Sequence, residues 1–230
     1  MKNFTSLLVV CMVAGNILPL RAQEMLYIGA EEYNGKFATV QRQMNYGDIQ
    51  GSPYLNDKLI KGWVKFNTGD STAYFLRYNV YTDEMEYLQG QNLYTVKNMQ
   101  RLAYVLLADY KFVYREYFIK GRQHRGYLAL LVTGQCRLYK RYRMGFVKAK
   151  TPESSYDKAT PAQFKVKPPQ WYVACGSGNI SYFGADNASL KELAGDQYAQ
   201  LKNYMKEQRL KFKNEADLKA LFVYYNSLRP

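Results

Sequence analysis

The chain has 230 residues, a formal net charge of +13 and an aromatic content of 16%. This length is sufficient for one domain with a substantial core, or for one domain with a helical appendage. A single histidine offers too few ligands for a His-ligated zinc site, and we expect neither a metal nor another cofactor.

The first 22 residues have the parts of a secretory signal peptide in the expected order. A basic start is followed by a mostly apolar run over residues 4–20, and Ala22 precedes the expected cleavage point. A membrane anchor needs about 20 predominantly apolar residues, whereas Asn16 and Pro19 interrupt this run. We therefore expect cleavage after Ala22 and a mature protein outside the cytoplasm.

Positive charge is concentrated in the centre of the chain. Residues 97–150 contain thirteen basic and two acidic residues, whereas residues 23–96 contain six basic and nine acidic ones. Such concentration is typical of proteins with anionic partners. Because export argues against nucleic acid, the pattern favours an anionic envelope polymer, a lipid head group with peripheral membrane association, or an acidic protein. The alternative is a solvated basic face that neutralises the acidic N-terminal segment.

In chain order, the predicted elements begin with a short strand or coil over residues 23–51. Strand-forming residues between turn signals, such as the hairpin turn predicted at residues 67–70, then predict an antiparallel sheet. Its strands are predicted at residues 62–66, 71–81, 84–88, 92–96, 110–119, 126–133, 137–147, 171–175 and 179–183. Residues 101–108 fit either a strand or a short helix. Residues 151–169 contain four prolines and predict a long surface connection.

The pattern becomes helical after residue 186. Helices are predicted at residues 187–193, 196–208 and 215–227. Asn214 caps the last helix, which carries an apolar stripe. The stripe consists of Leu218, Leu221, Phe222 and Tyr225. Since the stripe needs a packing partner and the sheet is the least demanding one, the fold class is α+β: an antiparallel meander, roll or sandwich with a C-terminal cluster of about three short helices.

These patterns divide the chain into three parts. We expect a signal peptide in residues 1–22, a mainly antiparallel β domain in residues 23–186, and a helical segment packed on the sheet in residues 187–230. Two cysteines remain after cleavage, Cys136 and Cys175, and each lies in a strand-like run. An oxidising compartment permits a disulfide between them, although two buried thiols fit the sequence as well.

A basic strip in residues 137–143 is the strongest binding candidate. In an extended strand, alternate residues share a face, so three arginines and a tyrosine would point the same way. The strip consists of Arg137, Tyr139, Arg141 and Arg143, and Arg115, Arg122 and Arg125 extend it. Arginines with an aromatic platform suit phosphate or carboxylate groups on a polymer. Exposed arginines that discourage edge-to-edge aggregation are the alternative.

Chemistry of other kinds has weaker support. The only histidine, His124, stands among arginines in a predicted loop, where a nucleophilic triad with a cysteine or serine has little support. Glu84 and Glu86 would share one face of a strand with their side chains roughly 7 Å apart. That spacing suits the two acids of a glycosidase. Solvated turn residues or partners of arginines such as Arg77 explain these acids more simply.

Several short segments resemble a known family. They are residues 51–55 (GSPYL), 62–64 (GWV), 76–81 (LRYNVY) and 83–87 (DEMEY), with residues 210–212, 215–218 and 224–228 near the end. With these segments the chain resembles an uncharacterised exported protein family of Bacteroidota. The resemblance implies a periplasmic or outer-membrane-associated location in a Gram-negative bacterium, and it carries no catalytic residue over.

The sequence therefore favours a non-catalytic envelope protein that binds or scaffolds through its basic, tyrosine-rich centre. The partner would be an anionic glycan, a lipid head group or an acidic protein. Two alternatives stay open. One is a carbohydrate-active enzyme that uses Glu84 and Glu86 in a cleft lined by aromatics such as Trp63 or Tyr87. The other is an accessory subunit of an outer-membrane complex that docks through its C-terminal helices.

Overall fold

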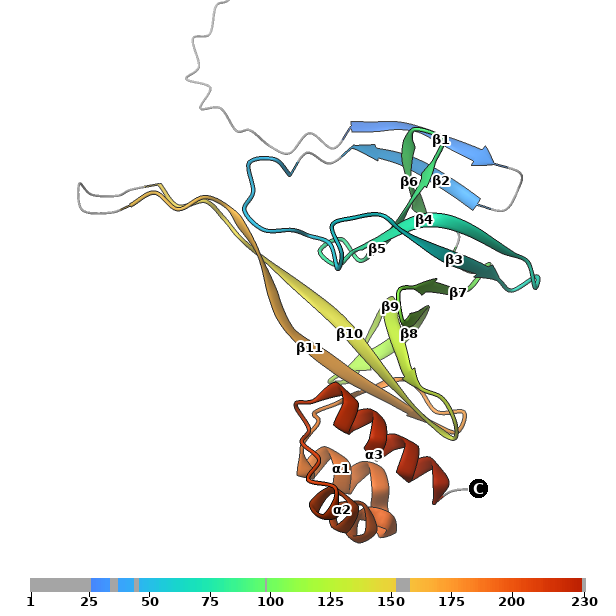
Figure 1. Ribbon diagram of the computed structural model, residues 1–230, viewed down its shortest axis with the longest axis vertical. Coiled ribbons are helices and arrows are strands. Elements are labelled where there is room, and N and C mark those ends of the chain that lie inside the picture. The colour runs from blue at the N-terminus through green and yellow to red at the C-terminus, as the bar shows by residue number, and fades with distance from the viewer. Residues whose placement is uncertain (1–25, 34–36, 44–45, 98, 152–157, 229–230) are drawn as a thin grey trace, which may run out of the picture.

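The computed structural model describes residues 26–33, 37–43, 46–97, 99–151 and 158–228. The predicted signal peptide in residues 1–22 thus lies outside the described residues. Figure 1 shows an antiparallel-rich β-sheet followed by C-terminal helices, which confirms the β-rich α+β class.

The strands form one sheet in the order β1-β2-β6-β5-β4-β3-β7-β8-β12-β11-β10-β9. Their bounds are β1 Leu26–Tyr33, β2 Phe37–Gln43, β3 Ile60–Phe66, β4 Ser71–Asn79, β5 Glu84–Gln89, β6 Asn92–Val96, β7 Leu102–Leu107, β8 Tyr110–Ile119, β9 Arg122–Val132, β10 Cys136–Val147, β11 Gln163–Cys175 and β12 Ser181–Phe183. Residues 101–108, which fitted a strand or a helix, thus form a strand. Residues 23–51, expected to form a short strand or coil, contain two strands, β1 and β2.

Strands β3 to β6 lie in consecutive order, each antiparallel to the next. The turn between β3 and β4 falls on the predicted residues 67–70, where Gly69 has a φ of 93° that favours glycine. Alternate side chains point into the core, among them Val64, Leu76 and Met85, which are fully buried. This alternation is expected of antiparallel strands with one face on a core.

Strands β8 to β12 close into a ring. Each strand pairs with the next along the chain, and β12 returns to pair in parallel with β8 at Phe118. One face of these strands forms a cluster that includes Tyr117, Tyr139 and Tyr172. The opposite face packs against the helices and the other strands. Since a ring of five strands has no room for helices, the tyrosine face is the inner one.

The helices pack on the outer face of the ring. They are α1 Asn187–Ala194, α2 Tyr198–Glu207 and α3 Glu215–Ser227, with a short 3-10 turn at Gly195–Gln197. The Asn214 side chain accepts the N–H groups of Ala216 and Asp217, so it caps α3 as predicted. The predicted stripe on α3 is buried. Among the described residues, no helix is long and apolar enough to cross a bilayer.

The β10–β11 ribbon is the main departure from the predicted elements. Residues 151–169 were expected to form a surface connection, but β11 already begins at Gln163. The register with β10 shifts between Arg141 and Arg143, opposite Pro168 and Pro169. Prolines are tolerated in a sheet at such a bulge. Because β10 and β11 stay paired past this bulge, the ribbon extends beyond the ring, as Figure 1 shows.

Candidate functional site

Three of the segments that resemble the family, residues 51–55, 76–81 and 83–87, lie side by side. Leu55 N–H donates to the Tyr78 carbonyl oxygen at 2.9 Å, and Val80 N–H donates to the Pro53 carbonyl oxygen at 2.8 Å. Residues 53–55 therefore run along the end of β4, which pairs with β5. These segments form one structural unit.

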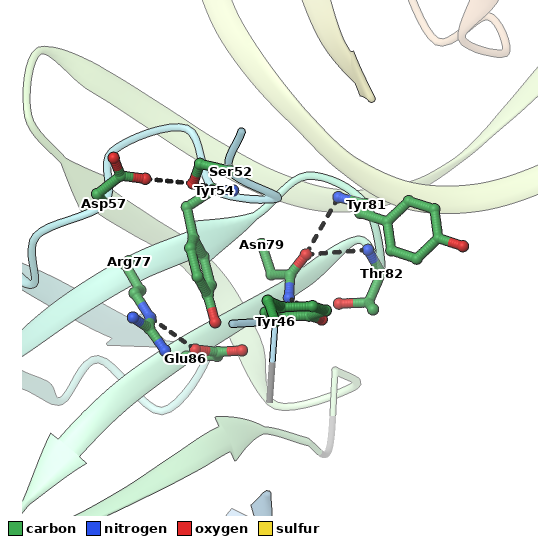
Figure 2. A network of polar contacts seen from close by, with 9 residues as sticks. All are labelled: Tyr46, Ser52, Tyr54, Asp57, Arg77, Asn79, Tyr81, Thr82 and Glu86. Carbon is green, nitrogen blue, oxygen red and sulfur yellow. Dashed lines mark hydrogen bonds and ion pairs between the residues drawn. The ribbon is translucent and has the colours of Figure 1, made fainter. Parts of the chain in front are cut away.

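A cation at the centre of this unit is held on two sides (Figure 2). Arg77 Nε donates to Glu86 Oε2 at 2.7 Å, and the guanidinium lies 3.8 Å from the centroid of the Tyr54 ring. Glu86 is 3% exposed, so this ion pair lies in a buried environment. Burial, followed by the nearby Glu86 charge, raises the pKa of the Tyr54 hydroxyl and keeps it neutral.

Asn79 fixes the turn that follows β4. Its side-chain oxygen accepts the N–H groups of Tyr81 and Thr82, both at 3.1 Å, and its amide nitrogen donates to the Tyr46 hydroxyl at 3.2 Å. Figure 2 shows these groups converging on Asn79. The side chain is fully buried, so it has a structural role.

The two glutamates proposed as an acid pair are each held by a cation. Glu86 pairs with Arg77, and Glu84 Oε1 lies 2.8 Å from Lys97 Nζ. Tyr87, expected to line a cleft beside them, is 1% exposed. The geometry therefore gives these carboxylates a structural role.

Asp83 is the most unusual titratable group near this unit. It has a φ of 56°, a left-handed conformation that Asp tolerates better than most residues. Its Oδ1 accepts the Tyr78 hydroxyl at 2.6 Å and the Tyr127 N–H at 3.3 Å. A Cβ at Gly126 would collide with its Oδ2. Burial raises the pKa of the Asp83 carboxyl, and the hydrogen bonds and the Arg141 charge oppose that rise.

We expect Asp83→Asn to stabilise the protein more at neutral than at acidic pH. A raised pKa in the folded state means that the Asp83 contribution is present below its ordinary value of 3.8 and is lost as the pH rises through the folded pKa. Asparagine keeps an acceptor oxygen and tolerates the same backbone conformation. Urea unfolding at about pH 3.5 and about pH 7 measures the difference. A variant that loses relative stability toward neutral pH would contradict the expectation.

The structure divides the predicted basic strip. Tyr139 is 4% exposed, so it is no platform for a ligand. Arg141 has a buried Nε without a hydrogen-bond partner among the described residues, and its guanidinium carbon lies 5.5 Å from the Tyr117 ring centroid. Arg137 Nη2 donates to the Gly176 carbonyl oxygen at 2.8 Å. Closing the ring thus places the first half of the strip on its inner face.

Arg143 belongs instead to the ribbon, where it faces lysines from β11. Arg143 is the register partner of Lys167, and Gly145 is that of Lys165. The Lys167 stem lies over Gly145, where a Cβ would come within 2.5 Å of its Cε. Lys165 and Lys167 are exposed. The prediction of a surface connection over residues 151–169 is the reason that the two lysines were not identified as candidate site residues. The alternation of Phe164 and Val166 with these lysines is nevertheless typical of a strand.

The ribbon is strongly basic along its described length. Residues 142–151 and 158–170 contain six basic side chains and no acidic one. The basic residues are Arg143, Lys148, Lys150, Lys158, Lys165 and Lys167. Glu153 and Asp157, which lie between these segments in the sequence, are outside the described residues.

Aromatic contacts hold the ribbon to the body. The Phe164 ring centroid lies 5.1 Å from that of Tyr81 and 5.3 Å from that of Tyr46. Phe164 N–H donates to the Gln50 carbonyl oxygen at 2.8 Å. Phe164 and its partner Phe146 point to the face opposite Lys165 and Lys167, because residues alternate along a strand. The ribbon thus has one anchored face and one basic face.

Arg115, Arg122 and Arg125 do not form one surface with the strip. Register places Arg115 opposite Gly126 and Arg122 opposite Ile119, on the inner side of the β8–β9 hairpin. Arg125 is on the other side, where it forms an ion pair with Glu116. Residues 122–125 belong to β9 rather than to the expected loop, and His124 stacks on Tyr117 there.

A surface cleft of about 460 Å³ lies where β8 meets several turns. It is lined by Asn67, Met99, Gln100, Leu102, Tyr114, Arg115, Glu116, Arg125, Gly178, Asn179 and Ile180. Two of the predicted arginines are among them. Leu102 comes from β7, and Tyr114 and Glu116 come from β8, while the remaining residues come from turns and loops that no local sequence pattern brings together. No set of three His, Cys, Asp or Glu side chains that could hold a metal occurs in the part of the chain that the structure describes.

Cys136 and Cys175 form a disulfide that joins β10 to β11. They are register partners, directly opposite each other on neighbouring strands. The bond closes the base of the ribbon, while the aromatic contacts of Phe164 hold its middle.

Comparisons with protein-family models, curated proteins and solved structures found no match to this chain.

Proposed function

We propose that this chain is an exported, non-catalytic envelope protein of a Gram-negative bacterium and that it binds an anionic glycan through the basic face of the β10–β11 ribbon. The observation that carries the proposal is that Arg143, Lys165 and Lys167 share one face of a ribbon whose described residues include six basic side chains and no acidic one. Uncompensated charges in a row attract a polyanion and raise its rate of association.

The form of the ribbon favours a linear polymer. Alternate residues on a strand are separated by about 7 Å, and directly opposite residues by about 5 Å. The three charges of Arg143, Lys165 and Lys167 together therefore span a length that a few sugar residues of one polymer can cover. Because the opposite face is anchored by Phe146 and Phe164, the basic face stays oriented outward.

Other features support export and the envelope location. Residues 1–22 have the pattern of a signal peptide, and a disulfide is typical of oxidising compartments. The resemblance to an exported family of Bacteroidota agrees with periplasmic or outer-membrane association. Of the architectures that the sequence left open, the return of β12 to β8 favours a roll.

Charge reversal on the ribbon should abolish glycan binding. We expect the mature protein to bind polygalacturonate at about 0.05 M salt and to lose most affinity at about 0.5 M salt, because ions screen exposed charges. In R143E/K165E/K167E, binding should be lost at both salt concentrations. Isothermal titration calorimetry with polygalacturonate, and with neutral dextran for comparison, measures the effect.

The matched control is K206E/K213E/K219E, which makes the same charge change on exposed lysines of the helical segment. Equal losses in the two variants would show a nonspecific charge effect and contradict the proposal. Vesicles with anionic lipid and an acidic polypeptide test the other partners. Stronger binding to either than to polygalacturonate would overturn the choice of a glycan.

A further inference from the structure

We infer that the cleft over β8 is a second binding site, for a short acidic saccharide. It is lined by Arg115, by the amide side chains of Asn67, Gln100 and Asn179, and by Met99, Tyr114 and Ile180. This inference stands apart from the ribbon, which shares no lining residue with the cleft.

The cleft exists because β8 lacks a strand partner over part of one edge. On that side β8 pairs with β7 through Tyr110, Lys111 and Phe112, and with β12 only at Phe118. Among the described strands none covers residues 113–117 there. Backbone groups on an unpaired edge remain able to bind a ligand.

Arg115 supplies the net charge of the cleft. Its Nη1 donates to the Tyr114 carbonyl oxygen at 2.9 Å, which turns the side chain along the open edge. No carboxylate among the described residues forms an ion pair with it. Arg125, in contrast, is neutralised by Glu116. An anionic ligand would therefore direct its carboxylate to Arg115, whose planar guanidinium can bind both oxygens.

The rest of the lining suits hydroxyl groups and a carbon ring. Gln100 and Asn179 are exposed, and amide side chains both donate and accept hydrogen bonds, as sugar hydroxyls do. Asn67 Nδ2 donates to the Gln100 carbonyl oxygen at 2.7 Å, which fixes the turn at one wall. Met99, Tyr114 and Ile180 offer apolar surface to the C–H groups of a sugar ring. A cation, amides and apolar walls together match a uronic acid.

Titration with digalacturonic acid, followed by calorimetry, tests the site. We expect saturable binding to the wild type and at least about tenfold weaker binding to R115A, because a charge-assisted hydrogen bond is lost. R115K keeps the charge but cannot bind both oxygens, so its affinity should be intermediate. R122A, an exposed arginine of the same hairpin outside the lining, should bind like the wild type.

The outcomes separate this site from the ribbon. R143E/K165E/K167E should bind digalacturonic acid normally even if it no longer binds polygalacturonate. The inference is overturned if the wild type binds digalacturonic acid no better than the uncharged digalactose, or if R115A binds it with unchanged affinity. Tighter binding of tetraglutamate than of digalacturonic acid would also overturn it, since a peptide would then be the ligand at the open edge.

Discussion

Replacing Phe222 by alanine should lower the free energy of unfolding by about 3 to 5 kcal/mol. Phe222 is fully buried in α3, and its ring centroid lies 5.6 Å from that of Phe183 on β12. Truncation would leave a cavity between the helices and the outer face of the ring, and the packed strands cannot collapse into it. Urea unfolding of the mature protein, monitored by tryptophan fluorescence, measures the change.

Two further variants decide whether this effect comes from packing. Phe222→Leu keeps most of the volume and should cost less than half as much as the alanine variant. Val223→Ala, at a side chain that is 60% exposed on the same helix, should change stability by less than about 0.5 kcal/mol. A small effect of Phe222→Ala would mean that the helices contribute little to the stability of the sheet.

Loss of the Cys136–Cys175 disulfide should cost about 4 kcal/mol. The two cysteines are separated by 39 residues, and the bond restricts that loop in the unfolded chain. The double alanine variant is preferable to serine, because Cys136 is fully buried and a hydroxyl there would need a new hydrogen bond. Thermal and urea unfolding of C136A/C175A against the oxidised wild type give the difference.

Reduction of the wild type provides an independent check on the disulfide. Dithiothreitol should lower the stability of the wild type to about that of C136A/C175A and should leave the variant unchanged. If reductant has no effect on the wild type, the bond does not stabilise the fold. Retained binding of polygalacturonate by the reduced protein would then show that Phe164 and its aromatic neighbours suffice to orient the ribbon.

Local patterns predicted the elements whose neighbours in space are also neighbours in sequence. The turn at residues 67–70 and the cap at Asn214 have signals within a few residues, and both occur where expected. The apolar stripe of α3 likewise indicated a buried face. In these places propensity and tertiary packing favour the same structure.

The sequence failed where pairing over long distances decided the outcome. Pro168 and Pro169 suggested a loop, yet a bulge opposite β10 accommodates them within a strand. The alternation of Arg137, Tyr139 and Arg141 was correct, but their burial depends on the closure of β12 onto β8, which has no local signal. The cleft depends on the same closure, so only its arginines could be singled out beforehand.

The central claim is that the basic face of the ribbon contacts an anionic glycan in the envelope. The most direct test is a photo-crosslinking amino acid at Val147, which is 42% exposed and opposes Gln163 on the face of Lys165 and Lys167, with Val223 on α3 as the control position. After irradiation of intact cells, we predict an adduct from position 147 that carries acidic sugar and is absent at position 223. An adduct with lipid or protein alone, or the same adduct from both positions, would contradict the account.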